Sequence, residues 1–189
     1  MDIPTFPAAP AIPAKSLTRI TVLQGQAWVS AGPRVEFSTV LGSCVATCLF
    51  DPEIEVGGMN HFLLAEPAGG ASGGAVIDEH YGVYLMEVLI NEMLANGAAK
   101  HRMRAHLYGG ANMHTGMAEI GTRNAAFARG FLASERIPLV REDLGGTCAR
   151  RVEFRPAIGQ VRCRTVSGLP APETVIRAPK HGTGDVELS

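Results

Sequence analysis

LGSCVATCLFDPEIEVGGMNH, residues 41–61, is the stretch that decides the fold. Residues 44–50 are almost continuously apolar and are stopped by Asp51-Pro52, which predicts a strand buried on both faces. Residues 54–64 predict the next extended segment. Adjacent antiparallel strands joined by a turn at this point would bring their outer ends, Cys44 and His61, side by side.

The remaining elements point to an α+β fold. Residues 19–30 are rich in β-branched and aromatic side chains, typical of a strand or hairpin, and residues 101–110 alternate as a half-buried strand does. Helical spacing predicts a helix over Tyr84–Asn96, ended by Asn96-Gly97, and a second from Thr122 as N-cap to a stop before Pro138. Residues 138–166 are turn-rich and β-like.

Composition indicates one globular domain. The 189 residues are 46% hydrophobic and 19% charged, which suits a single core. We expect a flexible Pro-rich leader at 1–16, the folded domain at 17–167 and a flexible tail at 168–189.

The same composition argues against several classes of partner. A net charge of −1 gives no reason to expect nucleic acid, and the longest uncharged run is too short to span a bilayer, so no direct membrane insertion is expected. With no secretory signal pattern, we expect a cytoplasmic protein. The four cysteines form no CxxC pair and the histidines no metal-binding spacing, so we expect neither a metal nor another cofactor.

Cys44 and His61 are the candidate catalytic pair. A thiol becomes a nucleophile only with a base or positive neighbour, most often histidine. Backbone N–H groups around Gly42 and Ser43 are candidates for an oxyanion hole, and Asn60 is a further candidate for binding substrate or the oxyanion.

Two questions stay open at this point. The hydroxyls of Ser38 and Thr39, just upstream, can orient the histidine or bind substrate. Because cysteine is among the most frequently buried residues, an inert core role for Cys44 is the alternative to catalysis.

Four blocks in this order resemble the chemoreceptor glutamine deamidase family, CheD. They are LGSCVATCLFDP at 41–52, GGMNHFLL at 57–64, YGGANM at 108–113 and GTRNAAFARGFLASERIPLVREDLGG at 121–146. The resemblance implies a mixed β-sandwich with flanking helices, similar to deamidating bacterial toxins. It also implies hydrolysis of glutamine side chains to glutamate on methyl-accepting chemotaxis receptors through a cysteine thioester, with the CheC phosphatase as a further partner.

The resemblance also assigns roles to residues. The family's nucleophilic cysteine falls on Cys44 and its histidine on His61. Its third residue, a threonine six positions before the cysteine, falls on Ser38, where the hydroxyl is kept; neighbouring Thr39 is the alternative. The rival functions are a non-catalytic adaptor that binds chemoreceptors or CheC, and a cysteine hydrolase or transglutaminase acting on other proteins through the same thioester.

Overall fold

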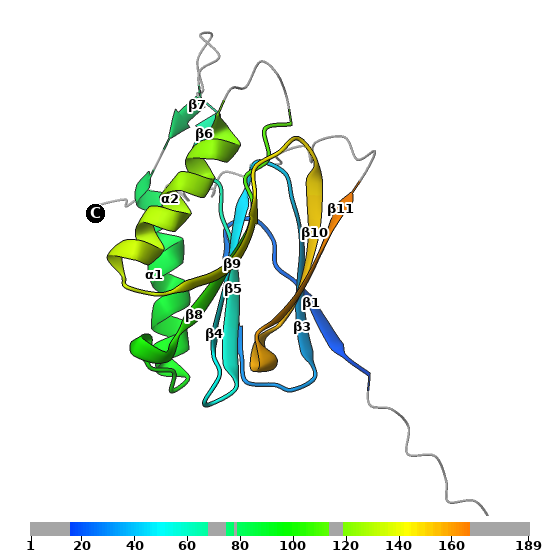
Figure 1. Cartoon of the computed structure of the whole chain (residues 1–189), viewed down its shortest axis with the longest axis vertical. Helices are drawn as coiled ribbons and strands as arrows, with labels where there is room; N and C mark the ends of the chain where they lie inside the picture. Colours follow the sequence, from blue (N-terminus) through cyan, green and yellow to red (C-terminus); the bar gives the residue numbers. More distant parts are fainter. Residues whose placement is uncertain (1–15, 68–74, 78, 114–118, 167–189) are drawn as a thin grey trace, which may run out of the picture.

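The computed structural model describes residues 16–67, 75–77, 79–113 and 119–166. The expected tail at 168–189 and the glycine-rich stretch at 68–74 fall outside these residues, as does the expected leader apart from residue 16. Figure 1 shows three layers: two helices, a five-stranded sheet and a four-stranded sheet. The predicted α+β architecture, a mixed β-sandwich with flanking helices, is confirmed.

The four-stranded sheet has the order β1-β3-β10-β11. Its strands are β1 Thr18–Thr21, β3 Val35–Leu41, β10 Ala149–Arg155 and β11 Gln160–Val166. Strand β3 pairs with β1 in parallel and with β10 in antiparallel fashion, so two segments remote from each other in the chain hold it.

The five-stranded sheet has the order β2-β5-β4-β8-β9. Its strands are β2 Gln26–Ser30, β4 Val45–Asp51, β5 Val56–His61, β8 Arg104–Gly109 and β9 Leu139–Leu144. β4 and β5 form the predicted antiparallel pair. Two short strands, β6 Ala65–Pro67 and β7 Ala75–Ile77, pair with each other outside both sheets.

The helices α1 Glu79–Ala95 and α2 Ile120–Ser134 cover the outer face of the five-stranded sheet (Figure 1). Two short 3₁₀ turns, η1 Lys100–Arg102 and η2 Pro156–Ile158, complete the described elements. One core cluster, including Leu49, Phe62 and Leu89, lies between helices and sheet. A second, including Phe37, Cys48 and Phe154, lies between the two sheets. Burial on both faces explains the uninterrupted apolar run of β4.

Residues 19–30 form strands, one of the two predicted alternatives, but not a hairpin, because β1 and β2 belong to different sheets and the chain crosses between them at residues 22–25. Two other local predictions were wrong. α1 begins at Glu79, five residues before the predicted start. α2 is capped by Glu119 in a left-handed conformation, while Thr122 lies inside the helix and accepts a hydrogen bond from Asn112 Nδ2.

The predicted end of α1 is confirmed. Gly97 has φ of +90° and its N–H donates to the Leu94 carbonyl, while the Ala98 N–H donates to the Met93 carbonyl. These two bonds form a Schellman C-cap, which needs a residue that adopts left-handed backbone angles at low cost.

Candidate active site

Cys44 sits immediately before β4, and its position is set by its backbone. The carbonyl oxygens of three consecutive residues are all bonded: Gly42 to the Ala111 N–H, Ser43 to Asn124 Nδ2 and Cys44 to the Gly110 N–H, at 2.7–2.8 Å. Since a trans peptide holds C=O and the next N–H antiparallel, these bonds also fix the N–H groups of Ser43 and Cys44. The Cys44 N–H lies against its own thiol.

The contact with β8 requires glycine. Gly109 has φ of +108°, and a Cβ added there would lie 2.2 Å from the Cys44 carbonyl oxygen. A side chain at this position would therefore push the nucleophile loop away. Backbone hydrogen bonds from Gly110 and Ala111 thus hold YGGANM closely against the loop that carries Cys44.

His61, the last residue of β5, faces the other sheet. The pairing of β4 with β5 ends in a bridge between Val45 and Phe62. In this register Ala46 lies opposite His61, and Cys44 lies diagonally across from it. The two residues, expected side by side at the ends of the strand pair, are thus offset by two positions from direct opposition. Diagonal neighbours on one face remain within reach of a long side chain such as histidine.

A hydrogen-bond network assigns the tautomer of His61. Thr39 Oγ1 lies 2.8 Å from the Val22 carbonyl oxygen and 2.9 Å from His61 Nδ1. A carbonyl only accepts, so the single hydroxyl proton goes to Val22, and Thr39 Oγ1 must accept from His61 Nδ1–H. The Val22 oxygen, 3.4 Å from Nδ1, supports the same tautomer. The lone pair of His61 is therefore on Nε2.

His61 Nε2 is buried and has no hydrogen-bond partner among the described residues. An unpartnered buried nitrogen is costly in a native structure, and a catalytic role is one of the explanations for such a group. A basic lone pair, held on the same face as the thiol, is the arrangement that general-base chemistry needs.

Burial keeps both groups neutral at rest. Desolvation raises the Cys44 pKa to about 12, opposed in part by the backbone N–H. Desolvation lowers the His61 pKa to about 4, opposed in part by the hydrogen bond to Val22. At neutral pH the pair is thus a thiol and an imidazole, not a thiolate and an imidazolium.

Ser38 and Asn60 point away from this pair. Successive side chains alternate across a strand, so Ser38 lies on the opposite face of β3 from Thr39, and in the described structure its hydroxyl makes no hydrogen bond to His61. Asn60 is fully buried on the helical side, where its amide bonds the Thr47 N–H and the Leu85 carbonyl. We infer that Asn60 joins β5 to α1 and does not bind substrate.

Two residues near Cys44 were missed by the sequence analysis. Cys44 Sγ donates to the Gln24 side-chain oxygen at 3.5 Å. Asn124, fully buried in α2, donates to the Ser43 carbonyl and accepts from the Leu64 N–H at 3.0 Å, so it ties the nucleophile loop to the segment after His61. The only sequence signal for Asn124 is a polar residue amid the small residues of the buried helix face.

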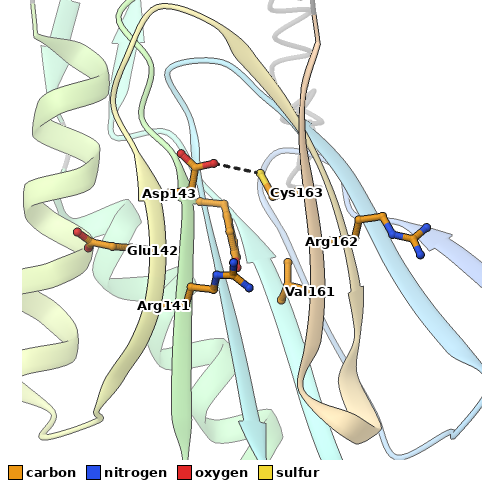
Figure 2. Close-up of a pocket in the computed structure, with 7 residues that line it drawn as sticks. Arg141, Glu142, Asp143, Val161, Arg162 and Cys163 are labelled. Atoms are coloured by element: carbon orange, nitrogen blue, oxygen red, sulfur yellow. Dashed lines mark hydrogen bonds between the residues drawn. The ribbon is translucent and has the colours of Figure 1, made fainter.

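A groove of about 490 Å³ at the open edge of the sandwich lies apart from these residues. It is lined by Tyr108, Arg141, Glu142, Asp143, Val161, Arg162 and Cys163. Figure 2 shows Asp143 of β9 facing Cys163 of β11, whose thiol donates to that carboxylate at 3.5 Å. Burial and the nearby Asp143 raise the Cys163 pKa to about 11, so its thiol is protonated at neutral pH.

Within the described ranges, no group of three or more His, Cys, Asp or Glu side chains is arranged to hold a metal ion. None of the described helices is long and apolar enough to cross a membrane.

Sequence comparisons with known proteins point to one family. The family described as CheD chemotactic sensory transduction matches residues 54–165. A protein of Zymomonas mobilis, named "Probable chemoreceptor glutamine deamidase CheD", is 55% identical over 89% of this chain and 91% of its own length. A protein of the same name from Caulobacter vibrioides is 47% identical over 90% of this chain and 92% of its own length. A solved DUF152-family structure from Neisseria meningitidis has a TM-score of 0.44 at 13% identity, covering 70% of this chain and 65% of that one.

Proposed function

This chain belongs to the CheD family, and from that premise we propose that it is a glutamine deamidase acting on chemoreceptors in the cytoplasm. The reaction is hydrolysis of a glutamine side-chain amide to glutamate and ammonia. The observation that carries the proposal is the Thr39-bound His61, whose free Nε2 lone pair shares a face with the Cys44 thiol.

In the first step Cys44 Sγ attacks the carboxamide carbon as its proton passes to His61 Nε2. Because both groups are neutral at rest, the proton transfer accompanies the attack and does not precede it. Thr39 Oγ1 accepts the Nδ1–H of the imidazolium that forms, which stabilises the charge.

The oxygen of the attacked carboxamide becomes an oxyanion. We assign its stabilisation to the backbone N–H groups of Ser43 and Cys44, whose orientation is fixed by the bonded carbonyls of the same loop. Fixed donors need no reorganisation as the charge develops, which makes them effective in a largely buried site.

The intermediate collapses when His61 returns the proton to the departing ammonia, leaving a thioester on Cys44. His61 then takes a proton from water, which attacks the thioester and releases glutamate. The cysteine leaves as the thiol, and no step uses a metal or an organic cofactor.

Intact-mass spectrometry of a chemoreceptor cytoplasmic fragment tests this function. The native protein should add about 1 Da per modified glutamine, since oxygen and one hydrogen replace NH₂. Cys44→Ala should add nothing. Cys148→Ala is the matched control, because this exposed cysteine lies outside the site, and it should act as the native protein does.

Absence of any mass gain with several receptors, together with co-purification of a receptor or of a CheC phosphatase, would replace the deamidase with the adaptor function. Amine incorporation in place of hydrolysis would identify a transglutaminase. The proposed partnership with CheC is tested separately, by size-exclusion chromatography of the two purified proteins mixed at micromolar concentration.

A further inference from the structure

Gln24 places a glutamine carboxamide of this chain against the nucleophile. Its side-chain oxygen accepts the Cys44 thiol proton at 3.5 Å, and the two residues are 20 positions apart in the chain. The group in contact with the thiol is thus the same functional group that the proposed reaction consumes.

The backbone around Gln24 is held on both sides of the site. The Leu23 carbonyl accepts from the Gln26 N–H at 3.0 Å, which closes a β-turn with Gly25, φ +82°, in its third position. The Val22 N–H donates to the Ser38 carbonyl and the Gly25 N–H to the His61 carbonyl, both at 2.8 Å. The turn that carries Gln24 is therefore tied to β3 and to the catalytic histidine.

This placement delivers a carboxamide without a binding step. The carbonyl carbon is bonded to Oε1 at about 1.23 Å, so it lies at most about 4.7 Å from Sγ. An approach of at most about 1.7 Å by this exposed side chain would give the roughly 3–3.5 Å of a near-attack geometry. Gln24 itself is exposed, so water has access to the carbon after attack.

We propose that Gln24 is a modification site: Cys44 deamidates it within the same molecule, converting it to glutamate. The inference rests on the proposed deamidase function. Cys44 Sγ forms a bond to the Gln24 carboxamide carbon while its proton moves to His61 Nε2. The carbon–nitrogen bond then breaks, and His61 returns the proton to the ammonia that leaves.

Water completes the reaction. It attacks the internal thioester, gives a proton to His61, and expels the Cys44 sulfur, which is reprotonated. One water is consumed, one ammonia is released, and residue 24 becomes a carboxylate in the same turn. Because a nearby negative charge disfavours a thiolate, each modified molecule is a slower enzyme.

The test follows Gln24 and a receptor fragment in the same tube. The protein is purified with its cysteines blocked as methyl disulfides, and the reaction is started by adding a reductant that frees them. Peptide mass spectrometry should show a gain of about 1 Da at Gln24, or about 3 Da in ¹⁸O-water, since the new carboxylate takes one oxygen from solvent. A first-order rate that is independent of protein concentration identifies reaction within one molecule.

Gln26 is the matched internal control. It lies two residues away, but its side-chain oxygen accepts from the Leu23 N–H and Trp28 Nε1, and no hydrogen bond joins it to Cys44 in the described structure. Gln26 should stay unmodified, as should Gln24 in Cys44→Ala.

The outcomes separate the two proposals. Receptor deamidation with an unchanged Gln24 overturns the inference and leaves the function standing. Equal conversion of Gln24 in native protein and Cys44→Ala also overturns it, because that conversion is uncatalysed. Failure of both substrates to react, in protein whose Cys44 is shown to be reduced, removes the proposed function and the inference with it.

Discussion

Replacing Thr39 by valine tests the assignment of the third site residue. Valine removes the hydroxyl that accepts from His61 Nδ1 while preserving the size and β-branching of the side chain. The Val22 oxygen, already 3.4 Å from Nδ1, can take over the proton and preserve the tautomer. The expected loss is therefore that of one hydrogen bond to a charged imidazolium, about 1.5–3 kcal/mol.

That energy corresponds to a fall in kcat of roughly 10- to 150-fold, with KM little changed, because the bond strengthens only when His61 is charged. Steady-state ammonia release from a receptor fragment measures it. Thr39→Ser should recover most of the rate. Thermal unfolding must accompany the kinetics, since the Val22 carbonyl also loses a donor.

Ser38→Ala is the matched control from the opposite face of β3. Its kcat should stay within about twofold of the native value, because its hydroxyl makes no contact with His61 in the described structure. A large loss in Ser38→Ala, with Thr39→Val still active and folded, would refute the assignment and restore Ser38 as the third residue.

Three further predictions concern the same site. The His61 pKa rises from about 4 in the fold to the ordinary 6.5 on unfolding, so its contribution to stability is full above pH 6.5 and is lost as pH falls toward 4. Urea unfolding measures the loss of unfolding free energy between pH 7 and pH 4.5, and this loss should be smaller in His61→Gln than in the native protein by up to about 3 kcal/mol. An equal loss in both proteins would contradict a buried neutral imidazole. Asn124→Ala leaves the buried Leu64 N–H and the partly buried Ser43 carbonyl unpaired. It should cost about 2–5 kcal/mol of unfolding free energy and at least about tenfold in kcat, whereas an unchanged kcat would deny Asn124 a positioning role. Iodoacetamide at pH 7.5 should label the exposed Cys148 at least about tenfold faster than Cys44, which is buried and neutral; prior labelling of Cys44 would show a resting thiolate.

The strand pair that carries Cys44 and His61 could be predicted because its signals are local. An apolar run ended by Asp51-Pro52 specifies a strand and its stop, and the hairpin follows from the short connection. The register could not be predicted to one residue, since it depends on the turn conformation and on packing. Glu55, with φ of +55°, lies in that turn, and its positive φ has no signature in the residue type.

The choice between Ser38 and Thr39 illustrates what local signals cannot give. Alternation shows that two neighbouring hydroxyls face opposite sides, but the side that meets the histidine depends on how the two sheets stack. Asn60 and His61 pose the same problem on β5. The contact of Gln24 with Cys44 depends on a chain crossing between the two sheets, and the pattern of residues 19–30 does not distinguish such a crossing from a hairpin.

The division of the site between two sheets also bears on biosynthesis. Cys44 and His61 emerge early and close together, yet Thr39 lies on β3, which is paired in register with β10 through Val152, more than a hundred residues downstream. Such a long-range pairing forms late, because the entropy lost in closing the loop is offset only by contacts with the distant strand. A nascent chain therefore exposes its cysteine before its histidine is locked, and we expect it to acquire activity only once most of the domain has left the ribosome.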